Sequence, residues 1–231
     1  MVCRYRADVM GCSLVVLSLG GMGAALASLI LANTDWLLPQ AEPAKLVYLA
    51  DAPLSSLDGE SRKFRAGELW RDRGAVVMAV RLARAVCGVC ALQEASLLSA
   101  LAPFLSEHDV PLAAVVHEDV GTEIKDFRPF FQGQVYLDQE VWRFYGPKER
   151  WMFWLGFVRL SVWRNFMRAR EGGFQGNMLG EGRILGGVYV IGAGDQGVLL
   201  DHKERQFGDI VNKTALMDAV RKIQPILKKL K

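Results

Sequence analysis

The sequence predicts an α/β domain in which a βαβ unit is followed, after a long insert, by a ββα unit. Two observations carry this prediction. Short apolar segments rich in β-branched residues, typical of buried strands, alternate with helical patterns between residues 75 and 146. Further along, a glycine-rich turn within residues 187–202 separates two strand patterns, and an amphipathic helix pattern follows at residues 214–227.

The first part of the domain is expected to run in the order β-α-β-α-β. Strands are predicted at residues 75–83, 110–118 and 133–139. A helix is predicted from Cys87 onward because apolar residues recur there at helical spacing, and Pro103 should kink or end it. Shorter helices are predicted at residues 64–74, 122–131 and 140–146. With the final hairpin and helix, this order is the thioredoxin-like arrangement, since parallel strands need helical crossovers.

The composition is that of a globular protein and excludes several classes. Of 231 residues, 51% are hydrophobic and 23% are charged. The net charge of +3 is too small to indicate nucleic-acid binding. Four cysteines are too few for a disulfide scaffold, and only Cys87 and Cys90 fall within the globular pattern.

The N-terminus carries a long apolar segment. Residues 10–32, "MGCSLVVLSLGGMGAALASLILA", contain no charge, and as a helix they would span about 35 Å, enough to cross a bilayer core of roughly 30 Å. Arg4 and Arg6 precede the segment, so membrane association through residues 10–32 is one interpretation. The basic start and a small-residue pattern at residues 25–27 also fit a cleaved signal peptide. The third interpretation is a hydrophobic helix that packs on the domain or on a membrane face.

These patterns divide the chain into four parts. They are a hydrophobic N-terminal segment, a linker with two prolines, the thioredoxin-like domain and a basic tail, at residues 1–38, 39–45, 46–227 and 228–231. The domain includes an aromatic-rich helical insert at residues 149–170, in which arginines interleave with tryptophan and phenylalanine. This helix is expected either to pack on the domain or line a partner groove, or to lie at a membrane interface.

The pair Cys87 and Cys90 is the candidate catalytic site. Cys87 stands at a helix N-terminus, where unpaired backbone N–H groups favour a thiolate, so we expect a thiol pKa below the free value of about 8.5. Cys90 lies one turn further, within bonding reach, so Cys87 would attack and Cys90 would resolve. Inert buried thiols are the alternative. A zinc site needs four ligands, but His108, His117 and His202 are scattered, and neither a metal nor an organic cofactor is predicted.

Two sequence features of related thiol enzymes are absent from this chain. The peroxiredoxin pattern places Pro seven residues and Thr or Ser three residues before the attacking cysteine, where this chain has Val80 and Arg84. Thioredoxins carry a proline just before the final hairpin, where Gly186 or Gly187 stands here. Any peroxide chemistry would need another group to polarise the peroxide, and Arg84 is the nearest candidate.

Several segments together resemble the peroxiredoxin-like 2A family, also described as redox-regulatory proteins or adiporedoxins. They include "GAVVMAVR", "CGVCALQEA", "EIKDFRPFF", "GEGRILGGVYVIG" and "FGDIVN", at residues 74–81, 87–95, 123–131, 180–192 and 207–212. The resemblance implies a thioredoxin-like fold, antioxidant activity and a Cys-x-x-Cys pair, which carries over onto Cys87 and Cys90. The expected partner is a thiol or disulfide reductant or a protein substrate. The expected localisation is cytoplasmic, with secreted or membrane-anchored forms as alternatives.

The chain departs from that family's pattern beside the pair. The family has "RRPGC" before the first cysteine, whereas "RLARAVC" here is two residues longer, and Ala91 stands where the family has Arg. The loss of that cation should weaken thiolate stabilisation. The alternative function is therefore a non-enzymatic regulatory or interaction protein built on the same scaffold.

Overall fold

The computed structural model describes residues 23–38, 40–57, 62–80, 86–116, 123–138, 143–146, 150, 158–174 and 185–225. Seven strands form one mixed sheet in the order β2-β1-β5-β4-β3-β6-β7. Their bounds are β1 Pro53–Ser56, β2 Lys63–Arg65, β3 Ala75–Ala79, β4 Leu112–Val116, β5 Gln134–Leu137, β6 Gly187–Ile191 and β7 Val198–Lys203. The α-helices are α2 Leu46–Ala50, α3 Val86–Ser99, α4 Ala102–Glu107, α5 Glu123–Phe127, α7 Leu160–Glu171 and α8 Lys213–Arg221. Short 3-10 helices are η1 Asp35–Leu37, η2 Ala66–Leu69, η3 Arg128–Phe130 and η4 Arg143–Tyr145.

The centre of the sheet confirms the predicted βαβ and ββα units. Strands β3, β4 and β5 are parallel, while β6 is antiparallel to β3 and β7 is antiparallel to β6. Val77 of β3 is paired with Ala113 on one side and with Tyr189 on the other. Every residue of β3 and β6 is buried, as expected for strands covered on both faces. The fold is therefore thioredoxin-like.

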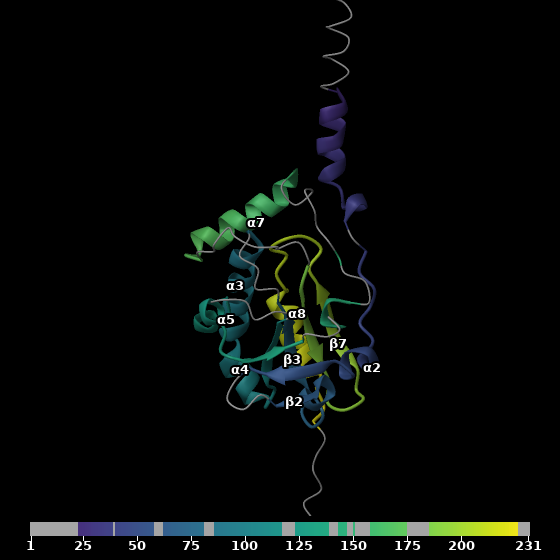
Figure 1. Ribbon diagram of the computed structural model, residues 1–231, viewed down its shortest axis with the longest axis vertical. Helices are drawn as coiled ribbons and strands as arrows, with labels where there is room; N and C mark the ends of the chain where they lie inside the picture. Colours follow the sequence, from purple (N-terminus) through teal and green to yellow (C-terminus); the bar gives the residue numbers. More distant parts are fainter. Residues whose placement is uncertain are drawn as a thin grey trace, which may run out of the picture.

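The two faces of the sheet pack against different layers, because successive side chains of a strand point to opposite sides. Val76 and Met78 face the apolar stripe of α3, together with residues of α4, α5 and α8. Ala75 and Val77 face the other side, where α2, η2 and η4 cover the sheet. Figure 1 shows α3, α4 and α5 gathered along one side of the molecule. As predicted, Pro103 separates α3 from α4 and occupies the first turn of α4.

The sheet is extended by a hairpin that the sequence patterns did not predict. Residues 64–74 were expected to form a helix, and this prediction is wrong: β2 runs through Phe64, and only η2 and a turn follow. Phe64 pairs with Leu54 of β1 and its ring lies 5.1 Å from that of Tyr136 in β5. Packing across the sheet therefore overrides the local helical preference.

At the N-terminus, residues 23–32 form a helix, drawn in purple, that rises from one end of the domain (Figure 1). Most of the predicted apolar segment 10–32 lies outside the described residues, so its three interpretations stay predictions. Among the helices that the structure describes, none has the length and apolarity needed to span a bilayer. Residues 149 and 151–157 of the aromatic segment 149–170 also lie outside the described residues, and α7 covers most of the described part.

Candidate functional site

The cysteine pair lies at the start of α3, the helix that follows the central strand β3. Val86 is the first residue of α3, so Cys87 falls in its first turn and Cys90 one turn further. The side chain of Cys87 and the residues Arg81 and Arg84 lie outside the described part of the chain. Of the predicted site, the structure therefore describes the surroundings of Cys90 in detail.

Cys90 is buried beneath two elements, with only 2% of its surface exposed. Its thiol packs with Val89 of α3 and Ala169 of α7, and Phe166 and Phe174 flank this cluster. Gly208 covers it from the other side: a Cβ atom at Gly208 would lie 2.7 Å from the Cys90 sulfur. Gly208 also has φ of +73°, a conformation that favours glycine.

Burial raises the pKa of the Cys90 thiol to about 12, and the negative charge of Glu204 adds to this effect. The Arg168 guanidinium opposes the rise in pKa. This arginine donates to the carbonyl oxygen of Gly208 at 2.9 Å and to Asn165 Oδ1 at 3.2 Å. Cys90 is thus a protonated, enclosed thiol with one cation nearby.

Two buried carboxyl groups lie next to this thiol. Glu94 follows Cys90 by one turn on the same face of α3, and its Oε1 accepts the Val211 N–H at 3.0 Å. Glu204, just after β7, accepts the Gly186 N–H at 2.9 Å. Burial raises the pKa of Glu94 to about 8 and that of Glu204 to about 7. The charge of Glu204 adds to the rise at Glu94, and the charge of Asp209 adds to the rise at Glu204. At neutral pH the pair can therefore hold or take up a proton.

Arg150 supports the segment around Glu204. Its guanidinium donates to the carbonyl oxygens of Glu204 at 2.5 Å and of Gly186 at 3.0 Å. Burial lowers the pKa of Arg150, while its positive charge lowers that of Glu204. Arg150 therefore connects Gly186, the residue before β6, to Glu204, the residue after β7.

Gly186 occupies the predicted position before the final hairpin, beside the end of β3. A Cβ atom there would lie 2.4 Å from the Ala79 carbonyl oxygen, and one at Gly187 would lie 2.6 Å from that of His202. The described residues contain no cis peptide bond. Close backbone approach, rather than a proline platform, shapes this side of the site.

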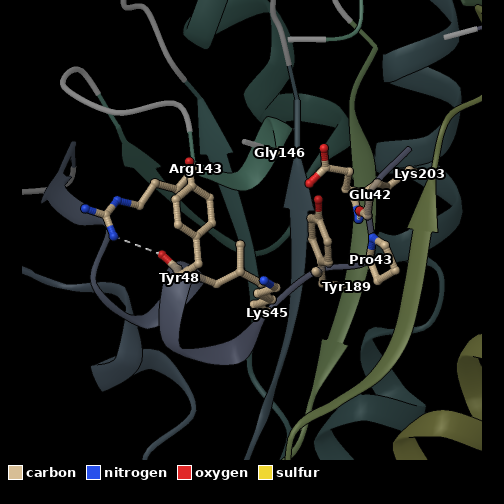
Figure 2. A pocket seen from close by; sticks show the side chains of 10 residues that line it. Glu42, Pro43, Lys45, Tyr48, Arg143, Gly146, Tyr189 and Lys203 are labelled. Carbon is tan, nitrogen blue, oxygen red and sulfur yellow. Dashed lines mark hydrogen bonds between the residues drawn. The ribbon is translucent and has the colours of Figure 1, made fainter. Parts of the chain in front are cut away.

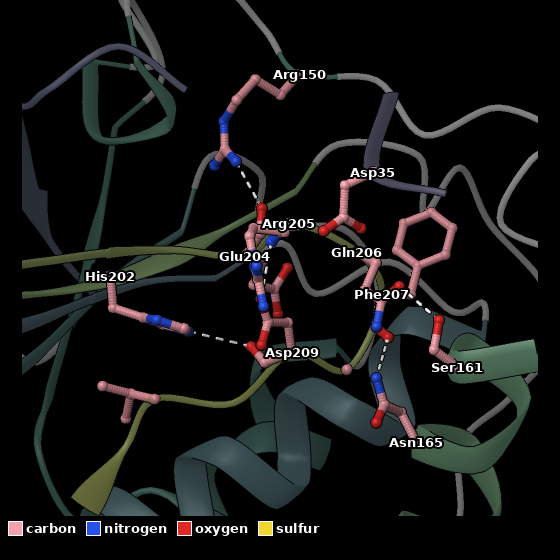
Figure 3. A network of polar contacts seen from close by, with 12 residues as sticks. Asp35, Arg150, Ser161, Asn165, His202, Glu204, Arg205, Gln206, Phe207 and Asp209 are labelled. Atoms are coloured by element: carbon pink, nitrogen blue, oxygen red, sulfur yellow. Dashed lines mark hydrogen bonds and ion pairs between the residues drawn. The ribbon is translucent and has the colours of Figure 1, made fainter. Parts of the chain in front are cut away.

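A polar network links the turn after β7 to α7 (Figure 3). Asn165 Nδ2 donates to the carbonyl oxygen of Phe207 at 3.0 Å, and Ser161 Oγ donates to Gln206 Oε1 at 2.6 Å. On the other side of the turn, His202 Nε2 and the Asp209 carbonyl oxygen are 3.2 Å apart. These hydrogen bonds fix the position of α7 and of the turn after β7, the two elements that bury Cys90.

No metal centre is found in the part of the chain that the structure describes: no three potential ligands gather there. A separate cavity of about 150 Å³ lies on the opposite face of the sheet, between Tyr48, Arg143, Tyr189 and Lys203 (Figure 2). Two of its three cations have internal partners: Lys203 pairs with Asp201 at 2.8 Å and Arg143 with Asp51 at 2.9 Å, while Lys45 is the third cation in its lining. We assign this cavity no role in the chemistry.

Four residues around Cys90 were not predicted from sequence patterns: Glu94, Glu204, Arg150 and Gly208. A signal existed for Glu94, because an acidic residue one turn after Cys90 stands in a helix that is otherwise largely apolar. Nothing in the local sequence places Glu204, Arg150 or Gly208 near Cys90, because only the fold brings them together.

Comparisons with known proteins find relatives that match most of this chain. Residues 97–206 match the family model described as AhpC/TSA antioxidant enzyme. The chain is 55% identical over 207 residues to peroxiredoxin-like 2A of Danio rerio, covering 90% of this chain and 96% of that protein. It is 50% identical over 206 residues to peroxiredoxin-like 2A of Homo sapiens, covering 89% and 88%. A solved structure, the bacterioferritin comigratory protein of Xanthomonas campestris, covers 79% of this chain and 98% of its own at 13% identity, but its TM-score of 0.43 is too low to support a functional argument.

Proposed function

Because the chain belongs to the peroxiredoxin-like 2A family, we propose that it is an antioxidant, redox-regulatory protein that reduces disulfides through Cys87 and Cys90. Cys87 is the attacking thiolate and Cys90 is the resolving thiol. The observation that carries this assignment is the enclosure of Cys90, with a raised thiol pKa, beside two buried carboxyl groups. An enclosed thiol can react with a disulfide held on its neighbour but not with a bulky substrate from solution.

In the first step, the Cys87 thiolate attacks one sulfur of a substrate disulfide. A new S–S bond joins Cys87 to that sulfur, and the other half of the substrate leaves as a thiolate. The first turn of α3 favours the negative charge that Cys87 needs, because its backbone N–H groups have no helical partner.

In the second step, Cys90 must lose its proton before it can attack. Glu94, one turn away on the same face of α3, takes that proton when it is ionised, and Glu204 is the second acceptor. The Cys90 thiolate then attacks the Cys87 sulfur, forms the Cys87–Cys90 disulfide and expels the remaining substrate thiolate. An external thiol reductant returns the pair to the dithiol, so electrons balance over the cycle.

The substrate class is a disulfide rather than a peroxide. Val80 and Arg84 occupy the positions where peroxiredoxins use Pro and Thr or Ser to bind and polarise a peroxide. The alternative, a non-enzymatic interaction protein, needs no reactive thiol. Trapping of a reaction intermediate therefore separates the two functions.

The test uses the full chain with Cys3 and Cys12 replaced by serine, so that only the proposed pair can react. Reduced protein is mixed with glutathione disulfide, quenched with acid and analysed by mass spectrometry. We expect Cys90→Ser to accumulate a glutathione adduct on Cys87, and the protein with both thiols to pass on to an internal disulfide. Cys87→Ser should form no adduct. Equal adduct formation in the two single variants, or none in either, would contradict the proposal.

A further inference from the structure

The outer face of α7 has an unusual polarity. Leu160, Trp163 and Met167 stand at helical spacing i, i+3 and i+7, and 61%, 46% and 53% of their surfaces are exposed. The inner face of α7 carries the residues that pack on the domain, including Val162 and Ala169. A surface helix of a soluble domain presents polar residues outward, whereas α7 presents an apolar stripe.

Basic side chains border this stripe. Arg164 and Arg168 flank it on one side and Arg170 on the other, while Glu171, four residues after Met167, ends the stripe and is the one acidic residue of the helix. Arg164 forms no hydrogen bond or ion pair with the described residues, and it lines a polar hollow of about 420 Å³ together with Arg159 and Arg205. Apolar residues bordered by arginines are typical of a helix that lies in the interface of a membrane.

The helix at residues 23–32 exposes a second apolar surface at the same end of the domain. Its side chains Leu26, Leu29, Ile30 and Leu31 are exposed, and Trp36 just beyond it is 87% exposed. Figure 1 shows α7 lying across the end of the domain from which this helix rises.

Hydrogen bonds fix these two surfaces to one another. Arg159, at the start of α7, donates to the carbonyl oxygens of Ala32 at 3.2 Å and Thr34 at 2.6 Å, and pairs with Asp35 at 3.1 Å. The Leu160 N–H donates to Asn33 Oδ1 at 2.9 Å. The exposed apolar residues of both helices therefore belong to one continuous end of the molecule.

We propose that α7 lies on a bilayer that contains anionic lipid, with Leu160, Trp163 and Met167 at the level of the acyl chains and Arg164 and Arg170 on the headgroups. Charge complementarity selects this occupant: the stripe and its arginines match an apolar layer beneath a negative surface. The inner face of α7 covers Cys90, so this contact holds the candidate redox site at the membrane surface.

The test measures hydrogen exchange of the α7 amides in the full chain. Because this signal is local to α7, it reports contact of this helix with the bilayer even if residues 1–32 also bind. Exchange is compared without vesicles, with phosphatidylcholine vesicles, and with vesicles that also contain phosphatidylserine. We expect the α7 amides to exchange more slowly only with the anionic vesicles. The double variant Leu160→Ser/Met167→Ser should abolish this slowing, and Arg164→Gln should reduce it about fivefold.

Matched controls come from the other end of the domain. Val47→Ser on α2 removes an apolar side chain that is even more exposed, and Arg71→Gln removes an exposed arginine, so both should leave the slowing unchanged. Three results would overturn the proposal. They are unchanged α7 exchange with anionic vesicles, equal slowing on uncharged vesicles, and slowing that rises with protein concentration alone, which would identify a second copy of the chain as the occupant.

Discussion

Glu94 follows Cys90 by one turn of α3, and each side chain is only 2% exposed. A carboxyl group and a thiol enclosed together are costly to ionise, and both pKa values are raised by burial. An enclosed thiol beside an enclosed proton acceptor is suited to one event, the release of a proton as Cys90 attacks a disulfide on Cys87.

Replacement of Glu94 should slow the resolving step. Without its carboxylate, the Cys90 proton has only Glu204 as a buried acceptor, so we expect Glu94→Gln to slow formation of the internal disulfide about tenfold or more. In the wild type this rate should rise with pH as the pair, with pKa values of about 7 and about 8, loses its protons. Quenched-flow mass spectrometry after addition of glutathione disulfide measures the rate. Glu107→Gln, an exposed substitution in α4, is the control, and an equal loss there would refute the assignment.

The same residue should make stability depend on pH. The pKa of Glu94 is raised in the folded state from 4.5 to about 8, so the folded state binds more protons than the unfolded state between these values. The stabilisation is complete below pH 4.5 and is lost as pH rises through about 8. Urea unfolding should show the free energy falling across this window, by at most about 1.4 kcal/mol per pH unit for this group, and Glu94→Gln should flatten the curve. A wild-type curve that is flat or rises over this range would contradict the burial of the carboxyl group.

Gly208→Ala should disturb both stability and the thiol. The new Cβ atom would lie 2.7 Å from both the Cys90 sulfur and the Asn165 Cβ atom, and the alanine would have to adopt a positive φ. We expect a loss of roughly 2–5 kcal/mol in the free energy of unfolding, from backbone strain and from crowding. Gly173→Ala is the matched control, since it has φ of +84° and open space around its Cβ position. If the free energy of unfolding falls equally in both variants, contacts of the new Cβ atom at Gly208 do not contribute to the loss.

Arg168→Gln should raise the pKa of Cys90 further, because this guanidinium is the cation that lowers it. It should also loosen the turn at Gly208, whose carbonyl oxygen Arg168 binds. Formation of the internal disulfide should therefore slow about tenfold, while attack by Cys87 keeps its rate. Arg170→Gln removes an exposed arginine of the same helix and should leave both steps unchanged. A slowing confined to the first step would place Arg168 elsewhere in the mechanism.

Much of the sheet could be predicted because its central strands carry their signal locally. The run Ala75–Ala79 is apolar and β-branched because β3 is buried on both faces, and the turn before Val198 is rich in glycine. The hairpin of β1 and β2 could not be predicted in this way. Its strands are short and partly polar, and they exist because Phe64 packs on Tyr136 of another strand.

Only the part of the site that depends on local sequence spacing could be predicted. The interval between Cys87 and Cys90 indicates a pair at a helix start, and the structure places Cys90 one turn into α3 as expected. Glu204 and Gly208 are distant in sequence, and they meet Cys90 only because β7 returns beside β6. Burial, which sets the raised pKa values, is a property of the packed domain and not of any local motif.

The most direct test of the redox assignment is the pH dependence of alkylation by iodoacetamide. It uses reduced full-length protein with Cys3 and Cys12 replaced by serine, and compares it with Cys87→Ser and Cys90→Ser in that background. We predict one fast-reacting thiol, lost in Cys87→Ser and kept in Cys90→Ser, that titrates below the free value of about 8.5. Cys90 should stay unreactive until the protein unfolds. Slow reaction of both thiols with ordinary pKa values, or faster reaction of Cys90, would contradict a redox pair and favour a binding function for this domain.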